Sequence, residues 1–106
     1  RRFDLDTIKN VWILGSGKAA APMGRALEKI LGKYLSGGFL STKYGHGLDL
    51  KKIDVLEAGH PLPDKNSEAA AQRIHSFIKE RVEPDDLVIC VFSGGASSAG
   101  ASAARL

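Results

Sequence analysis

The chain has 106 residues, of which 43% are apolar and 25% charged, and its formal net charge is +3. This length fits about one domain, and the composition is that of a water-soluble globular protein. The charge is too small and too dispersed to predict a nucleic-acid or membrane partner, and no apolar stretch is long enough to span a bilayer. Because no initiator methionine is present, we expect the chain to start inside a longer protein.

The first part of the chain predicts strands around one helix. Residues 11–14 form an apolar run closed by glycine, which is typical of a buried strand. Residues 18–31 predict a helix that tolerates Pro22 in its first turns and stops at Gly32. Its expected apolar stripe is Met23, Ala26, Leu27, Ile30 and Leu31.

Two more strands are predicted over residues 38–42 and 53–58. Fewer than a dozen residues separate them, which disfavours a parallel crossover helix, so one of the two could run antiparallel at an edge. His46 lies in the loop between them, and we assign it no role.

The second part predicts a helix after the turn-rich residues 59–64, capped by Asp64 or Asn66, with Glu68 in its first turn. Residues 83–86 end this helix, and 87–92 form the clearest strand. The expected buried stripe of the helix is Ala70, Ile74, Phe77, Ile78 and Val82.

Cys90 is the single cysteine, and its place inside the strand 87–92 predicts a buried thiol. A lone cysteine favours a reducing compartment, and hence the cytoplasm. The alanine-rich residues 99–106 show no amphipathic pattern, and we interpret them either as the start of a truncated helix or as an imperfectly represented region.

Alternating strands and helices predict an α/β fold of Rossmann-like, three-layer type with a mostly parallel sheet. Two helices cannot cover both faces of a four-stranded sheet. We therefore expect the chain to be incomplete at one or both ends.

Two loops rich in glycine and serine follow predicted strands, where open α/β sheets bind their ligands. Glycines let backbone N–H groups approach an anion, and serines add hydroxyl donors. The sequence therefore predicts two phosphate-binding loops at one edge of the sheet. The residues are Gly15, Ser16, Gly17 and Lys18 in the first loop, and Ser93, Gly94, Gly95, Ser97 and Ser98 in the second.

The first loop matches neither standard nucleotide motif fully. Residues 15–20 formally satisfy G-x-G-x-x-G/A, but the next strand ends without the acidic residue that would hold a ribose. A Walker A loop fails because Trp12 replaces its first glycine and alanine follows Lys18. Lys18 itself lies where a helix dipole disfavours a cation, which an anionic partner would explain.

The segments GSGKAAAPMG, TKYGHG, EAGHPLPD and FSGGASS, in this order, resemble the glycerate kinases that form 2-phosphoglycerate. The resemblance covers nearly all of residues 11–98. Members of that family have an N-terminal Rossmann-like domain and a C-terminal MOFRL domain, and some carry the name hydroxypyruvate reductase. The resemblance therefore implies that residues 1–106 are part of the N-terminal α/β domain of a larger two-domain protein, and that the C-terminal domain is absent from this chain.

The resemblance implies ATP-dependent phosphorylation of D-glycerate with Mg²⁺, in a cleft between the two domains. It implies a catalytic Lys18, phosphate or substrate binding by the Ser93–Ser98 loop, and a His60 that lines the cleft. It also implies metal ligands outside this chain, a fragment inactive by itself, and leaves a homodimer open. Ala96 stands where the family has a third glycine.

Two other functions stay open. An NAD(P)H-dependent hydroxypyruvate reductase would share the fold, although the missing ribose-binding acid argues against it. A non-catalytic phosphosugar-binding module would also place serine-rich loops at strand ends.

Overall fold

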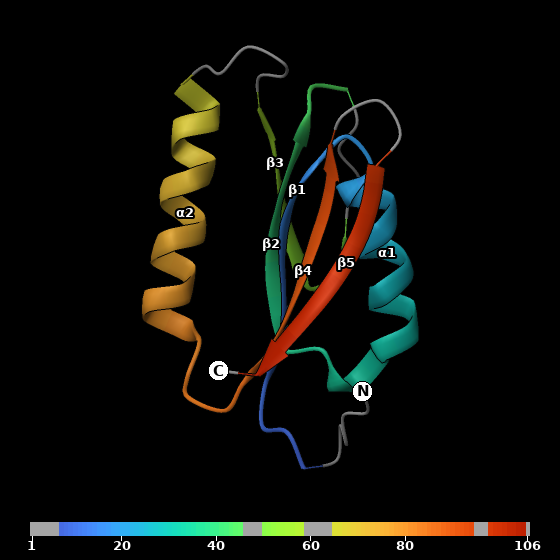
Figure 1. Ribbon diagram of the computed structural model, residues 1–106, viewed down its shortest axis with the longest axis vertical. Helices are drawn as coiled ribbons and strands as arrows, with labels where there is room; N and C mark the ends of the chain where they lie inside the picture. The colour runs from blue at the N-terminus through green and yellow to red at the C-terminus, as the bar shows by residue number, and fades with distance from the viewer. Residues whose placement is uncertain (1–6, 46–49, 59–64, 95–97, 106) are drawn as a thin grey trace.

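The chain forms a five-stranded sheet with one long helix packed on each face (Figure 1). The computed structural model describes residues 7–45, 50–58, 65–94 and 98–105. The described elements are β1 (Val11–Gly17), α1 (Ala20–Leu31), the 3-10 turn η1 (Gly32–Tyr34), β2 (Gly37–Lys43), β3 (Ile53–Ala58), α2 (Lys65–Arg81), β4 (Leu87–Gly94) and β5 (Ser98–Arg105). The predicted three-layer α/β fold is confirmed.

The strand order is β3-β2-β1-β4-β5, and the first four of these strands run parallel. From β1 the chain moves outward to β2 and β3, and α2 then carries it back to β4 on the other side of β1. Helix α1 connects β1 to β2, and α2 connects β3 to β4, so the two connections move across the sheet in opposite directions. Because both crossovers are right-handed, α1 and α2 lie on opposite faces of the sheet. The strand order therefore reverses between β1 and β4.

Helix α1 packs closely on the sheet because Gly24 has no side chain. A Cβ at Gly24 would lie 2.5 Å from the Cδ1 atom of Leu40 on β2. The buried side of the helix therefore runs through Gly24 and Leu31, with Met23 and Leu27 partly buried. The prediction for Ala26 and Ile30 was wrong, since both are exposed, Ile30 by 78%. They lie about a quarter-turn or more outside the line of closest approach.

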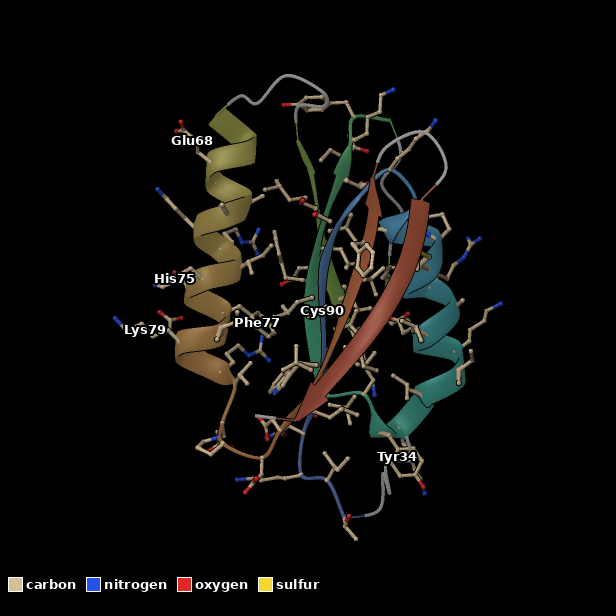
Figure 2. The ribbon with its side chains drawn as sticks, in the orientation of Figure 1. Tyr34, Glu68, His75, Phe77, Lys79 and Cys90 are labelled. Carbon is tan, nitrogen blue, oxygen red and sulfur yellow. The ribbon has the colours of Figure 1, made fainter. Side chains whose placement is uncertain are left out.

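Helix α2 packs on the opposite face through Ala70 and Phe77, with Ile74 and Val82 partly buried. Figure 2 shows Phe77 on the side of α2 that faces the sheet. The ring of Phe77 meets the Trp12 ring edge to face, with 5.3 Å between the ring centroids. Ile78 was expected in this core but is 42% exposed. The first-turn position of Glu68 is confirmed. Asn66 lies inside α2 and does not precede it.

The prediction of an antiparallel strand among residues 38–42 and 53–58 was wrong, because β2 and β3 are parallel. Residues 44–52 connect them without a crossover helix among their described positions. A parallel connection has to return along the full length of the strand. Nine residues can span at most about 30 Å, which exceeds the length of a seven-residue strand, so this connection is long enough without a helix. The Glu28 carboxylate on α1 accepts hydrogen bonds from the N–H groups of Lys51 and Lys52, and so holds the end of this connection.

The antiparallel strand is β5 instead, paired with β4 from Leu87↔Arg105 to Gly94↔Ser98. The tail is therefore a strand and not the start of a helix. The free edge of β4 offers backbone partners along its whole length, and such pairing outweighs the helix propensity of alanine.

The prediction of a buried Cys90 was also wrong, because its side chain is exposed. Cys90 lies on β4 on the same side as Val88, which packs in the α2 cluster. Helix α2 packs mainly over β2 and β3. A helix is about 10 Å in diameter and neighbouring strands lie about 4.8 Å apart, so one helix covers about two strands and leaves this part of β4 uncovered. Figure 2 shows Cys90 in the middle of the sheet, away from α2.

Candidate phosphate-binding site at the ends of β1 and β4

The two sequence segments predicted to bind phosphate meet at one place in the fold. Strands β1 and β4 are neighbours, and their parallel pairing continues to Gly17↔Ser93. The strand order reverses between these same two strands. In open α/β sheets such a reversal leaves a crevice beyond the carboxyl ends, which is where ligands bind.

The first segment turns sharply out of the sheet. Gly17 has a φ of 125°, a conformation that favours glycine over any residue with a Cβ. Lys18 and Ala19 follow, and α1 begins at Ala20 with Ala19 as its N-cap residue. The Lys18 side chain is therefore presented at the start of α1, where it is exposed.

Gly15 has a different reason to be glycine. A Cβ at this position would overlap the carbonyl oxygen of Val91 on β4. Close packing of β1 against β4 therefore accounts for Gly15, whether or not its N–H contacts a ligand. Ser16 is exposed one residue later and pairs with Ser41 on β2 and Phe92 on β4.

The start of α1 is electropositive. No side chain caps the helix, and no acidic residue lies in its first turn. Helix α2 differs, since Glu68 lies in its first turn and offsets its dipole. The exposed Lys18 adds a full positive charge to the uncompensated end of α1. An anion bound there would be stabilised by both the dipole and the ammonium group.

The second segment is shorter than the predicted loop. Ser93 and Gly94 continue β4, and Ser98 begins β5 opposite Gly94, so that three residues connect the two strands. The antiparallel pairing of β5 converts the expected open loop into the end of a hairpin. Gly95, Ala96 and Ser97 lie outside the described residues, as do His46, His60 and Asp64.

Thr42 is a residue of the site that sequence reasoning did not single out. Its hydroxyl is buried at the end of β2 and donates a 2.8 Å hydrogen bond to the carbonyl oxygen of Gly17. In the sequence this strand end stands out only because it lacks an acidic residue. No sequence signal separates Thr42 from the neighbouring Ser41, because burial and the direction of the side chain come from the sheet.

The described residues do not fit a Mg²⁺ site by themselves. No group of three or more His, Cys, Asp or Glu side chains in the described ranges could hold a metal ion. Divalent cations of this kind need oxygen ligands, usually carboxylates.

One hollow in the described part of the chain lies away from this edge. It has a volume of about 350 Å³, lies near the C-terminal end of α1, and includes Glu28 and Lys52 in its lining. The Lys52 ammonium donates to the carbonyl oxygens of Gly32 and Leu35. These bonds anchor the segment that leads into β3, so the polar groups of this hollow already have a structural role.

Sequence comparison gives a family match along the whole chain. Residues 1–105 match the family described as "Domain of unknown function (DUF4147)". The chain belongs to this family. Among the helices of the described part, none is long and apolar enough to cross a membrane.

Relatives of known name are glycerate kinases and hydroxypyruvate reductases. The chain is 43% identical over 88 residues to a glycerate 2-kinase of Pyrococcus horikoshii, covering 83% of the chain and 19% of that protein. It is 42% identical over 86 residues to a putative hydroxypyruvate reductase of Agrobacterium vitis, covering 81% and 22%. The predicted resemblance to glycerate kinases is thus confirmed.

The fold comparison agrees. The crystal structure of a glycerate kinase from Thermotoga maritima superposes with a TM-score of 0.69 and 32% identity, over 77% of this chain and 20% of that one. The chain therefore spans about a fifth of the length of the proteins that it matches.

Proposed function

We propose that this chain is part of the N-terminal domain of a glycerate 2-kinase, which phosphorylates D-glycerate to 2-phosphoglycerate with ATP. The observation that carries the proposal is the pairing of Gly17, which directly precedes Lys18, with Ser93 on β4 at the reversal of strand order. The names of the relatives supply the substrate class. A C-terminal domain would complete the cleft.

In this proposal Lys18 carries the chemistry of the described part. The 2-hydroxyl oxygen of glycerate bonds to the γ-phosphorus of ATP while the bond from that phosphorus to the ADP oxygen breaks, so that ADP leaves and the hydroxyl proton is released to solvent. Negative charge spreads over the transferred group, and the ammonium of Lys18 would stabilise it. Backbone N–H groups around Gly17 and Gly94 and the hydroxyls of Ser16, Ser93 and Ser98 are proposed to bind phosphate or substrate.

The remaining assignments complete the proposal. Gly95, Ser97 and His60 are proposed to line the same cleft, and Mg²⁺ would be bound by residues outside this chain. Mg²⁺ would neutralise phosphate charge when bound. We place the reaction in the cytoplasm, in line with the single cysteine.

A hydroxypyruvate reductase is the second candidate, since two related proteins carry that name. A dinucleotide site would need an acidic group at the end of β2 for the ribose. Here that strand ends at Thr42 and Lys43, and the Thr42 hydroxyl is turned onto the carbonyl of Gly17. This contact makes the reductase the weaker candidate.

One experiment separates the candidates. The full-length protein is incubated with ATP, Mg²⁺ and D-glycerate, and in parallel with hydroxypyruvate and NADH or NADPH. The kinase proposal predicts glycerate-dependent ADP formation and no loss of reduced nucleotide. Oxidation of NAD(P)H without ADP formation would replace it with the reductase, and phosphosugar binding without either turnover would favour a binding module.

A further inference from the structure

The pairing of β1 with its two neighbours ends at different residues. Toward β4 the ladder continues to Gly17↔Ser93, whereas toward β2 it stops at Ser16↔Ser41. At the next position on the β2 side, the Thr42 hydroxyl donates to the Gly17 carbonyl oxygen at 2.8 Å. A side chain thus replaces the backbone ladder where the chain begins to leave the sheet.

The same hydroxyl reaches the next carbonyl group. Thr42 Oγ1 lies 3.4 Å from the carbonyl oxygen of Lys18, so its proton is shared between two acceptors. These carbonyls belong to the two peptide groups that flank Lys18. Thr42 is only 4% exposed, and a buried hydroxyl is costly unless it is hydrogen-bonded. The two contacts satisfy it.

The direction of these bonds determines what the turn presents. In a planar trans peptide the C=O and N–H groups point in opposite directions. Since the Gly17 carbonyl oxygen points toward the Thr42 hydroxyl, the N–H of Lys18 points away from Thr42. Thr42 therefore fixes the orientation of the peptide group that joins Gly17 to Lys18, at the edge of the sheet where the phosphate site is proposed.

We propose that Thr42 is a positioning residue for Lys18 in phosphoryl transfer and acts through the Gly17–Lys18 peptide. This inference rests on the proposed kinase function. A valine has nearly the same shape as threonine and suits a strand, so the hydroxyl is the group that matters. Because Lys18 is assigned to charge that develops during transfer, loss of its positioning lowers kcat and leaves KM for ATP and glycerate nearly unchanged.

The test compares Thr42→Val with Thr42→Ser in the full-length protein. Ser36→Ala is the control, because the Ser36 hydroxyl accepts a hydrogen bond from the N–H of Val11 at the opposite edge of the sheet. We expect Thr42→Val to lower kcat about tenfold or more with KM within about twofold. Thr42→Ser and Ser36→Ala should keep kcat within about threefold.

Combination with Lys18→Ala shows whether Thr42 acts through Lys18. In that background Thr42→Val should lower kcat by less than about twofold further, because the positioned group is already gone. A full additional loss of about tenfold would overturn the proposal, as would a Thr42→Val variant with the kcat of Ser36→Ala.

Amide hydrogen exchange tests the geometry without turnover. Thr42→Val should speed exchange at the Lys18 amide about tenfold, whereas Thr42→Ser should leave it near the wild-type rate. Unchanged exchange in Thr42→Val would overturn the positioning role. If wild-type protein shows no glycerate-dependent ATP turnover, the kinase function fails, and the exchange result alone then supports or overturns the geometric role of Thr42.

Discussion

The indole Nε1 of Trp12 donates a 2.8 Å hydrogen bond to the Asp86 carboxylate, which is only 1% exposed. The N–H of Glu83 and the side-chain amide of Asn10 donate to the same carboxylate. These bonds join the start of β1 to the turn before β4, at the edge opposite the candidate site. From the sequence, residues 83–86 were predicted only to end a helix.

This network predicts a pH-dependent stability. Burial by itself raises the pKa of Asp86, but the hydrogen bonds from Glu83, Trp12 and Asn10, with the charge of Lys9, lower the pKa below its ordinary value. A lowered folded-state pKa means that the ionised carboxylate stabilises the fold above the unfolded pKa of about 3.9. This contribution is lost as the pH falls through the folded pKa.

Asp86→Asn should therefore lower the free energy of unfolding by about 1–3 kcal/mol at pH 7, because an amide cannot accept all of these bonds. The difference from wild type should shrink below about pH 4. Urea denaturation at pH 7 and pH 3 measures this, with Asp85→Asn, at an exposed position of the same turn, as the control. An equal loss at both pH values would contradict the role of the charge.

Lys18→Ala should lower the kcat of the full-length protein about a hundredfold or more while the fold is retained, because an ammonium aimed at developing charge is lost. Steady-state kinetics and circular dichroism measure the two properties. Lys29→Ala is the control, since Lys29 lies in the last turn of α1, at its far end from Lys18. Unchanged turnover by Lys18→Ala would remove Lys18 from the mechanism.

Gly15→Ala should destabilise the fold by about 3 kcal/mol or more, because its Cβ would overlap the backbone of β4 and force the strands apart. Gly32→Ala is the matched control. Gly32 has a φ of 52° and a ψ of −121° but no atom within 4 Å of an added Cβ, so only the backbone conformation is strained, at about 1–3 kcal/mol. Thermal unfolding measures the loss of stability in both variants. Gly15→Ala should lose more stability than Gly32→Ala, and equal losses would argue against close packing as the reason for Gly15.

Two neighbouring apolar residues of α1 should behave oppositely. Leu31 is buried, so Leu31→Ala should cost about 2–5 kcal/mol, whereas Ile30→Lys should change stability by less than about 0.5 kcal/mol. Urea denaturation of the two variants measures this contrast. A large loss for Ile30→Lys would mean that Ile30 is covered in the full-length protein.

The sequence predicted the features that follow from local pattern. Continuous apolar runs and helical spacing placed four strands and two helices, and a glycine marked the end of α1. The errors concern residues whose environment depends on neighbours in space. Cys90 lies in an apolar run but is exposed, because α2 packs mainly over other strands, and Ile30 is turned out by the close approach at Gly24.

The site was predictable to a similar degree. Glycines, serines and a lysine at two strand ends predicted an anion-binding edge, and the strand order supplied the reason why these two ends are adjacent. The role of Thr42 was not predictable, because it depends on the hydrogen bond that its hydroxyl donates to the Gly17 carbonyl oxygen on the neighbouring strand. The parallel pairing of β2 and β3 was likewise not predictable. The connection between them is held by hydrogen bonds from the N–H groups of Lys51 and Lys52 to the Glu28 carboxylate on α1, which is distant in sequence.

Transfer of label from [γ-³²P]ATP tests the central claim most directly. Full-length protein is incubated with labelled ATP, Mg²⁺ and D-glycerate, and the products are separated. The account predicts radioactive 2-phosphoglycerate from the wild-type protein and about a hundredfold less from Lys18→Ala. Label that never appears on glycerate, or appears equally with Lys18→Ala, would contradict it.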